Sequence, residues 1–323
     1  MVAVFPAPVL VDVGAVIAML RRPERLGCRV DDYTIIIPCY GDHGPPLYVE
    51  EGRTVVVVDA GDKSDAIRRG LEQASTEYVV ILDADTVPSQ DLGRACGALR
   101  RAGADIASTI VLPMPLGGLL AGLQMVEYEI AMKIRRLSPY LTSGACIIAR
   151  ADALRRIMEH HSGVFDGEDI EIGLIARRLG MRVIHVDLTA LTMVPQTMRG
   201  LIAQRVRWTR GFIRLAARYF RQLGPHAIYG LVAFLGLTPL KALSIDTMIA
   251  AVLPAIYLAY LAITLVASRT AALGYRLLYP LYSLLMAILT PVATLMAWLR
   301  DAVKKQGQRQ SSRAETGIRY IRL

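Results

Sequence analysis

The sequence is poor in cysteine and in aromatic residues. Of its 323 residues only 4 are cysteine and 7% are aromatic, whereas 54% are apolar. The cysteines lack C-x-x-C spacing and histidines at metal-binding intervals, which excludes a disulfide scaffold and a structural zinc site. We read them as reduced core thiols in a domain that faces the cytosol. They are Cys28, Cys39, Cys96 and Cys146.

Charge is almost absent from residues 226–299, where only Lys241, Asp246, Arg269 and Arg276 carry it. The net charge of the whole chain is +9. The excess is concentrated in 199–221, with 7 arginines and no acid, and in 301–323, with 6 basic and 2 acidic residues. Because these basic segments flank apolar ones, they indicate contact with lipid headgroups. No signature of a nucleic-acid-reading protein is present, so nucleic acid is not an expected partner.

Two uncharged runs are long enough to cross a bilayer, Thr247–Ser268 and Leu277–Leu299. At about 1.5 Å rise per residue, each covers roughly 30 Å of hydrocarbon. We expect a transmembrane hairpin, with a buried soluble hairpin as the alternative. Residues 1–20 predict a further span, and 226–243 predict a helix lying in the interface. The expected segments are a transmembrane helix (1–20), a cytosolic domain (21–198), interfacial helices (199–243), the transmembrane hairpin (244–300) and a basic cytosolic tail (301–323).

The soluble part alternates short apolar runs with helical periodicity. Buried strands are predicted at Tyr33–Ile37, Thr54–Val58 and Tyr78–Leu82. Helices are predicted between or after them, at Lys63–Ala74 and Gln90–Arg101. This order predicts an α/β fold with a parallel, doubly wound sheet. Ligands of such sheets bind at the carboxyl ends of the strands.

Asp83-Ala-Asp85 directly follows the third predicted strand. Two carboxylates at this spacing can hold a hard divalent cation, which would neutralise a diphosphate. A solvated turn is the alternative, because D-x-D occurs often by chance.

A second acidic pair, Glu168-Asp169, precedes a predicted helix over Ile170–Leu179. Such a pair is commonly a helix cap with a favourable dipole charge. The functional alternative makes Asp169 the base that removes a proton from a hydroxyl.

Gln204-Arg-Val-Arg-Trp208 lies within the arginine-rich stretch. A basic amphipathic helix on anionic lipid is one interpretation. In the other, Arg205 and Arg207 clamp a diphosphate and Trp208 forms a platform for a sugar. One helix face is predicted to be apolar, comprising Leu201, Trp208, Phe212, Leu215, Tyr219 and Leu223.

Taken in order, these motifs resemble family 2 glycosyltransferases, and within them the branch similar to cellulose synthase and hyaluronan synthase. The likeness covers about residues 33–211, and Gln124-x-x-Glu127-Tyr128 adds to it. The motifs are P-x-Y (38–40), Asp59 after a strand, D-x-D (83–85), T-S-G-A (142–145), G-E-D (167–169) and Q-R-x-R-W (204–208).

The resemblance implies a GT-A fold (that of nucleotide-diphospho-sugar transferases) and transfer of a sugar with inversion, using Mg²⁺ or Mn²⁺. It implies Asp169 as general base aligned by Glu168, and Asp83 and Asp85 as metal ligands. It places Ser143, Gly144 and Trp208 at the acceptor. The residues that it assigns to the nucleotide sugar are Pro38, Tyr40, Asp59, Lys63, Asp83, Gln204, Arg205 and Arg207.

The chain departs from that pattern between Asp59 and Asp83, which are only 24 residues apart. Relatives usually place another strand and helix there, so the nucleotide-binding half is expected to be abridged. The usual Asn-Glu after P-x-Y is Gly41-Asp42 here.

Three membrane spans are too few for a polymer channel, so a single sugar transferred to a lipid-borne acceptor fits better. The expected enzyme is a compact mannosyltransferase that uses GDP-mannose and a polyprenyl- or dolichyl-phosphate-linked acceptor in N-glycan assembly. It is expected to be an integral protein of the cell membrane, in contact with membrane lipid. The alternatives are a processive polysaccharide synthase that uses a UDP-sugar and a non-catalytic membrane protein that binds nucleotide sugars.

Overall fold

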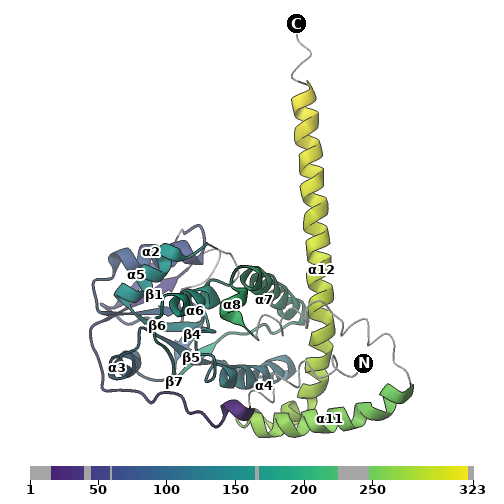
Figure 1. Ribbon diagram of the computed structural model, residues 1–323, viewed down its shortest axis with the longest axis horizontal. Helices are drawn as coiled ribbons and strands as arrows, with labels where there is room; N and C mark the ends of the chain where they lie inside the picture. Colours follow the sequence, from purple (N-terminus) through teal and green to yellow (C-terminus); the bar gives the residue numbers. More distant parts are fainter. Residues whose placement is uncertain (1–15, 40–44, 59, 164–166, 225–246, 319–323) are drawn as a thin grey trace.

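The computed structural model describes residues 16–39, 45–58, 60–163, 167–224 and 247–318. Its centre is a seven-stranded sheet in the order β2-β1-β3-β6-β5-β7-β4 (Figure 1). The strands are β1 (Tyr33–Pro38), β2 (Thr54–Val57), β3 (Tyr78–Leu82), β4 (Thr86–Pro88), β5 (Ile106–Pro113), β6 (Cys146–Arg150) and β7 (Val183–Thr192). The helices are α2 (Lys63–Gln73), α3 (Leu92–Ala102), α4 (Leu119–Ile134), α5 (Ala151–His160), α6 (Glu168–Arg178), α7 (Met198–Arg218), α8 (Phe220–Leu223), α11 (Thr247–Ala267) and α12 (Leu273–Ile318).

The predicted α/β fold with a doubly wound sheet is confirmed, but the sheet is mixed and not parallel throughout. The three strands read from the sequence, β1, β2 and β3, are parallel to one another. Strand β6, however, runs antiparallel to both of its neighbours, β3 and β5, and β4 runs antiparallel to β7. The reversal at β6 follows from the connection that carries α4. This connection leaves β5 at the carboxyl edge of the parallel strands and returns to the same edge, so β6 must run the other way.

Helices cover both faces of the sheet, as a doubly wound arrangement requires. Helices α3 and α4 pack on one face through side chains such as Leu99 and Tyr128. Helices α2, α5 and α6 pack on the other through Ile67, Leu154 and Ile175. Figure 1 shows the two layers on either side of the strands. Cys96 and Cys146 lie in this core as expected, but Cys28 is exposed.

The abridgement expected between Asp59 and Asp83 is visible in the sheet. A single helix, α2, connects β2 to β3, and β1 separates these two strands. Strand β2 therefore forms the edge of the sheet, and Val56 is 40% exposed there. Asp59 itself lies outside the described residues.

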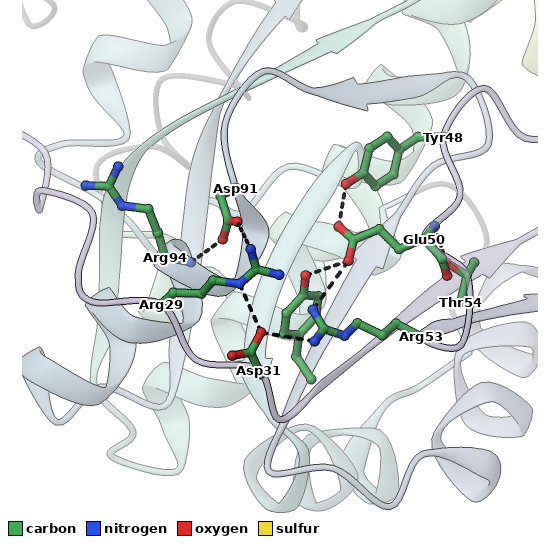
Figure 2. A network of polar contacts seen from close by, with 9 residues as sticks. Arg29, Asp31, Tyr48, Glu50, Arg53, Thr54, Asp91 and Arg94 are labelled. Atoms are coloured by element: carbon green, nitrogen blue, oxygen red, sulfur yellow. Dashed lines mark hydrogen bonds and ion pairs between the residues drawn. The ribbon is translucent and has the colours of Figure 1, made fainter.

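A polar network ties the segment before β2 to the start of β1 (Figure 2). The carboxylate of Glu50 accepts hydrogen bonds from the hydroxyl of Tyr48 and, at 2.6 Å, from that of Tyr33. Burial, reinforced by the bond to Glu50, raises the pKa of Tyr33 to about 12. Arg53 completes the network by pairing with Asp31 at 3.0 Å. These contacts hold residues 48–53, which lead into β2, against the start of β1.

Replacing Glu50 by alanine is therefore expected to destabilise the fold without touching the candidate site. The hydroxyls of Tyr33 and Tyr48 would lose a charged acceptor, which costs about 2 kcal/mol of unfolding free energy. Thermal unfolding in detergent would measure this, with Glu51→Ala at the exposed neighbouring position as control. Equal melting temperatures for the two variants would contradict the assignment.

Helices α11 and α12 join the domain through a third apolar cluster, which includes Leu123 of α4, Leu201 of α7 and Tyr282 of α12. The cluster is fastened by Glu129 of α4, a buried carboxylate that accepts a hydrogen bond from the hydroxyl of Ser268. The same carboxylate accepts bonds from the backbone N–H groups of Thr270 and Ala271. Burial alone would raise the pKa of Glu129, but these hydrogen bonds lower it. The short turn between α11 and α12 is thus held on α4.

Helix α12 is a single helix of 46 residues, about 69 Å long. Within the described residues, Leu273–Asp301 is the one stretch long and apolar enough to cross a membrane, and 17% of its apolar window is buried. Helix α11 contributes a shorter apolar stretch, Tyr257–Ala267. Figure 1 shows α11 running across the base of α12 rather than alongside it. The predicted helical segments of the hairpin are therefore present, and their crossing in the membrane stays a prediction.

Two other predicted membrane segments lie mostly or wholly outside the described residues. Of the span predicted at 1–20, only residues 16–20 are described, and the interfacial helix predicted at 226–243 is not described. The basic tail beyond 301 continues α12 as far as Ile318.

Candidate active site

The sequence motifs gather at one edge of the sheet. The parallel strands β1 and β3 end there, at Pro38 and Leu82, so Asp83 and Asp85 follow at the same edge. Strand β6 is antiparallel to β3 and begins at this edge, which places Ser143 and Gly144 beside Asp83. The backbone N–H of Asp83 donates to the carbonyl of Ala145 at 3.1 Å. Pro38 is buried in the strand, and Tyr40 lies outside the described residues.

Lys63 connects the two acidic motifs. Its Nζ lies 2.6 Å from Oδ1 of Asp83 and 3.4 Å from Oε1 of Glu168. It also donates to the carbonyl of Gly144 at 3.3 Å. Asp62 caps α2 by accepting from the N–H of Asp65, so Lys63 is the first residue of the helix. A cation is disfavoured at that end of a helix dipole, and the surrounding carboxylates offset this.

The charge state of Lys63 follows from the same contacts. Burial alone would lower the pKa of its ammonium group, but attraction to Asp83, Glu168 and Asp169 outweighs burial and raises it. Burial raises the pKa of Asp83 to about 6, although Lys63 acts in the opposite direction. Lys63 is therefore a permanent cation that holds Asp83 and the Glu168–Asp169 pair at one place.

Asp169 is held in position by the T-S-G-A segment. Its Oδ2 accepts a hydrogen bond from the backbone N–H of Gly144 at 2.8 Å, and its carbonyl accepts one from the hydroxyl of Thr142. A Cβ at position 144 would lie 2.8 Å from Nζ of Lys63 and 3.4 Å from Oδ2 of Asp169, so a side chain there would displace the Lys63 ammonium group. Burial and, next, the negative charge of Glu168 raise the pKa of Asp169.

Glu168 behaves differently from its neighbour. Its Oε2 accepts from the N–H of Gly167 at 3.0 Å. Burial would raise its pKa, but Lys63 and then this backbone bond lower it. The pair lies in the first turn of α6, where the helix dipole favours anions, and the cap residue is Gly167. The two adjacent carboxylates therefore lie in different electrostatic environments.

Asp85 offers a further carboxylate at the same edge. Its Oδ1 accepts hydrogen bonds from the hydroxyls of Thr86 at 3.2 Å and Thr192 at 3.3 Å. The contacts described above for Asp83 and Asp85 both involve Oδ1. Carboxylate oxygens are ligands that suit Mg²⁺ or Mn²⁺. Among the described residues no group of three or more His, Cys, Asp or Glu side chains could hold a metal alone.

The Q-R-x-R-W motif lies on α7 and divides into exposed and buried members. Arg207 is exposed, Gln204 is half-buried, and Trp208 is 47% exposed. Arg205 is 7% exposed, and its guanidinium lies 4.4 Å from the centre of the Trp208 ring. Glu127 of α4 pairs with Arg205 at 2.6 Å.

The predicted apolar face of α7 is confirmed at its ends and differs in its middle. Leu201 and Leu215 are fully buried, as expected. Trp208 is half-exposed, and Arg205 takes a buried position instead. The partner that makes this burial possible, Glu127, is 78 residues away in the sequence.

Helix α4 and its C-cap supply two residues, Tyr128 and Arg135, that the sequence motifs did not assign to the site. Tyr128 lies 6.3 Å from Trp208, ring centre to ring centre, and the charge of Asp85 also acts on its hydroxyl. Burial lowers the pKa of Arg135, although the negative charge of Asp169 acts in the opposite direction. Tyr128 thus places α4 beside Trp208. Tyr128 was visible in the Gln124-x-x-Glu127-Tyr128 pattern, whereas Arg135 had no signal.

Comparisons with known proteins identify the class. The family model described as "Glycosyl transferase family group 2" matches residues 78–299. The poly-β-1,6-N-acetyl-D-glucosamine synthase of Staphylococcus aureus is 27% identical over 183 residues, which are 53% of this chain and 44% of that protein. The chain therefore matches less than half the length of these curated relatives.

A solved structure shares the fold over nearly the whole chain. It is a mannosyltransferase from Pyrobaculum calidifontis, PcManGT, in complex with GDP-Man and Mn²⁺. The TM-score is 0.54 at 18% identity, covering 91% of this chain and 96% of that one. The chain belongs to glycosyl transferase family group 2, and its α/β fold is of the GT-A type.

Proposed function

We propose that this glycosyltransferase is a metal-dependent, inverting enzyme that moves one sugar from a nucleotide sugar to a lipid-linked acceptor. The observation that carries the proposal is the convergence of Asp83 and the Glu168–Asp169 pair on Lys63. At this edge of the sheet, the D-x-D motif offers ligands for a cation that binds a diphosphate, and Asp169 offers a base. Neither a covalent intermediate nor a nucleophilic side chain is needed for inversion.

In the proposed reaction, Asp169 removes the proton of the acceptor hydroxyl. Because its Oδ2 is bonded to Gly144, Oδ1 is assigned to this proton. The hydroxyl oxygen forms a bond to C1 of the sugar as the bond from C1 to the diphosphate breaks. Glu168 and Lys63 keep the base oriented. Ser143, Gly144 and Trp208 are proposed to line the acceptor side.

The leaving diphosphate would be received at the D-x-D motif and α7. A divalent cation held by Asp83 and Asp85 would supply neutralisation of the departing charge. We assign contact with the diphosphate to Arg207 and Gln204, because Arg205 is already engaged by Glu127. The proposed contacts with the nucleotide of the donor remain Pro38, Tyr40, Asp59 and Lys63.

GDP-mannose is the preferred donor in this proposal, and a polyprenyl- or dolichyl-phosphate-linked glycan of the N-glycan type is the preferred acceptor. Mannose is suggested by the mannosyltransferase that shares the fold. A lipid acceptor is suggested by the apolar stretch of α12 beside the domain, which would make this an integral membrane protein with a cytosolic catalytic domain. In the part of the chain that the structure describes, two apolar helices, α11 and α12, flank the domain, and we propose transfer of a single sugar there.

A processive polysaccharide synthase is the second candidate, favoured by the similarity to the staphylococcal polymer synthase. One experiment separates the two. Purified protein is incubated with Mn²⁺, dolichyl phosphate and radiolabelled GDP-mannose, UDP-glucose or UDP-GlcNAc. Mannose label in the organic phase, at one sugar per lipid, supports the proposal. A long aqueous polymer made from a UDP-sugar would replace it by the second candidate.

The pH dependence of the proposed base gives a further prediction. A base whose pKa is raised loses activity at a higher pH than an ordinary aspartate, because its deprotonated fraction falls as the pH drops through that pKa. Glu168→Gln removes a negative charge that raises the pKa of Asp169. The acidic limb of kcat/KM is therefore expected to move to lower pH. Glu159→Gln, an exposed change on α5, is the control. A limb that stays in place or moves upward would contradict Asp169 as the base.

A further inference from the structure

Trp208 is a large, half-exposed side chain that is nevertheless held on two sides. The guanidinium of Arg205 lies 4.4 Å from its ring centre, and Tyr128 lies 6.3 Å away. Arginine stacks on an indole face through cation–π attraction, which fixes the plane of the ring. The orientation of Trp208 therefore depends on where Arg205 is held.

Arg205 is held by one carboxylate oxygen. Its Nη2 lies 2.6 Å from Oε2 of Glu127. A buried cation requires such a partner, because it cannot be left unpaired away from water. Its Nη1 makes a longer contact, 3.3 Å, to Gln204, and its Nε has no hydrogen-bond partner. Glu127 is thus the principal anchor of Arg205.

The same oxygen is also bound from the C-terminal helix. The hydroxyl of Tyr282 on α12 donates to Oε2 of Glu127 at 2.9 Å, across 155 residues of sequence. Tyr282 is 6% exposed and packs in the cluster formed by α4, α11 and α12. Two donors therefore share one acceptor, and the position of that acceptor depends on both.

Helix α12 is fixed relative to the domain at two further points. Asp301 pairs with Arg210 of α7 at 2.9 Å, and the turn before α12 is bound by Glu129 of α4. Figure 1 shows α12 passing beside both α4 and α7. Its placement is therefore defined well enough to deliver the Tyr282 hydroxyl to Glu127.

We propose that Tyr282 is a positioning residue which, through Glu127 and Arg205, sets the orientation of Trp208 and so couples the C-terminal helix to the acceptor side of the site. The helix that we place at the membrane would then do more than anchor the enzyme. Acceptor would bind well only when α12 is seated against α4. The link from Trp208 to the acceptor rests on the proposed function, whereas the link from Tyr282 to Trp208 does not.

The first measurement reads Trp208 directly. The chain has 2 tryptophans, Trp208 and Trp298, so a Trp298→Phe background leaves Trp208 as the sole indole fluorophore. In this background, Tyr282→Phe is expected to increase the acrylamide quenching constant of Trp208 and to shift its emission to longer wavelength. Tyr260→Phe is the matched control, since it removes an equally buried hydroxyl of the same cluster, bonded to Ser283 at 2.7 Å. This control is expected to leave Trp208 unchanged.

The second measurement separates positioning from general damage. Loss of one hydrogen bond to a charged group corresponds to about a tenfold effect. Tyr282→Phe is expected to raise the KM for dolichyl phosphate by that factor, with the KM for the sugar donor unchanged. Equal quenching in Tyr282→Phe and Tyr260→Phe, or parallel changes in both KM values, would overturn the proposal. If dolichyl phosphate accepts no sugar, the proposed function fails, but the quenching result still decides the coupling.

Discussion

Asp169→Asn is expected to lower kcat by about 10²- to 10⁴-fold, the range that general base catalysis supplies. Asparagine keeps the shape of the side chain, and its carbonyl oxygen can still accept the hydrogen bond from Gly144. It cannot take a proton from a hydroxyl. Initial rates under saturating donor and acceptor would measure the loss.

Folding is expected to survive this substitution. Because the pKa of Asp169 is raised in the folded state, its charged form is disfavoured there and reduces stability at pH values above that pKa. Removing the charge should leave the melting temperature at neutral pH equal to, or above, that of the wild type. A variant that folds, binds the donor and retains full turnover would rule out the base assignment. If the wild type bound nucleotide sugars without turnover, the chain would instead be a non-catalytic binding protein.

The second large effect is expected from Asp85→Ala, which removes one of the two carboxylates proposed to hold the cation. Metal ions contribute several kcal/mol of charge stabilisation, so kcat/KM is expected to fall by about 10²- to 10³-fold. The apparent Mn²⁺ concentration for half-maximal activity is expected to rise in the same variant. A manganese titration of activity would measure both.

Asp152→Ala is the matched control for Asp85→Ala. Asp152 follows β6 at the opposite edge of the sheet, and its side chain is 65% exposed. It should leave the manganese titration unchanged. An Asp85→Ala enzyme with the manganese dependence of this control would show that the D-x-D motif is a solvated turn.

Much of the site-bearing edge could be predicted, because its determinants are local. The run Tyr78–Leu82 is entirely buried and ends at Asp83, as its composition indicates. A few neighbouring residues determine where such a strand runs, where it ends and which polar residues follow it. The same holds for Glu168 and Asp169, which begin α6 where an acidic pair and an amphipathic pattern meet.

The direction of β6 could not be predicted in this way. Cys146–Arg150 is a five-residue apolar run that would serve equally in either orientation. Its antiparallel pairing with β3 is decided by the connection through α4, which is a property of the whole topology.

The burial of Arg205 was equally hidden from the sequence. Helical periodicity places position 205 near the apolar face, but an arginine there is expected to point to water. Its burial depends on Glu127 and Tyr282, which lie on two other helices. Contacts between residues so far apart leave no periodic signal. The role of Tyr282 therefore emerges only from the fold.

The proposed mechanism requires a cation and a diphosphate to bind at the D-x-D motif, beside Asp169 and Trp208. The most direct measurement is the anomalous scattering of Mn²⁺ in crystals of the protein grown with a nucleoside diphosphate. We predict a manganese peak within coordination distance of the carboxylate of Asp85 or Asp83, next to the bound diphosphate, with Asp169 and Trp208 lining the same cavity. A manganese peak bound elsewhere, or a diphosphate in a cavity that Asp169 does not line, would contradict the account.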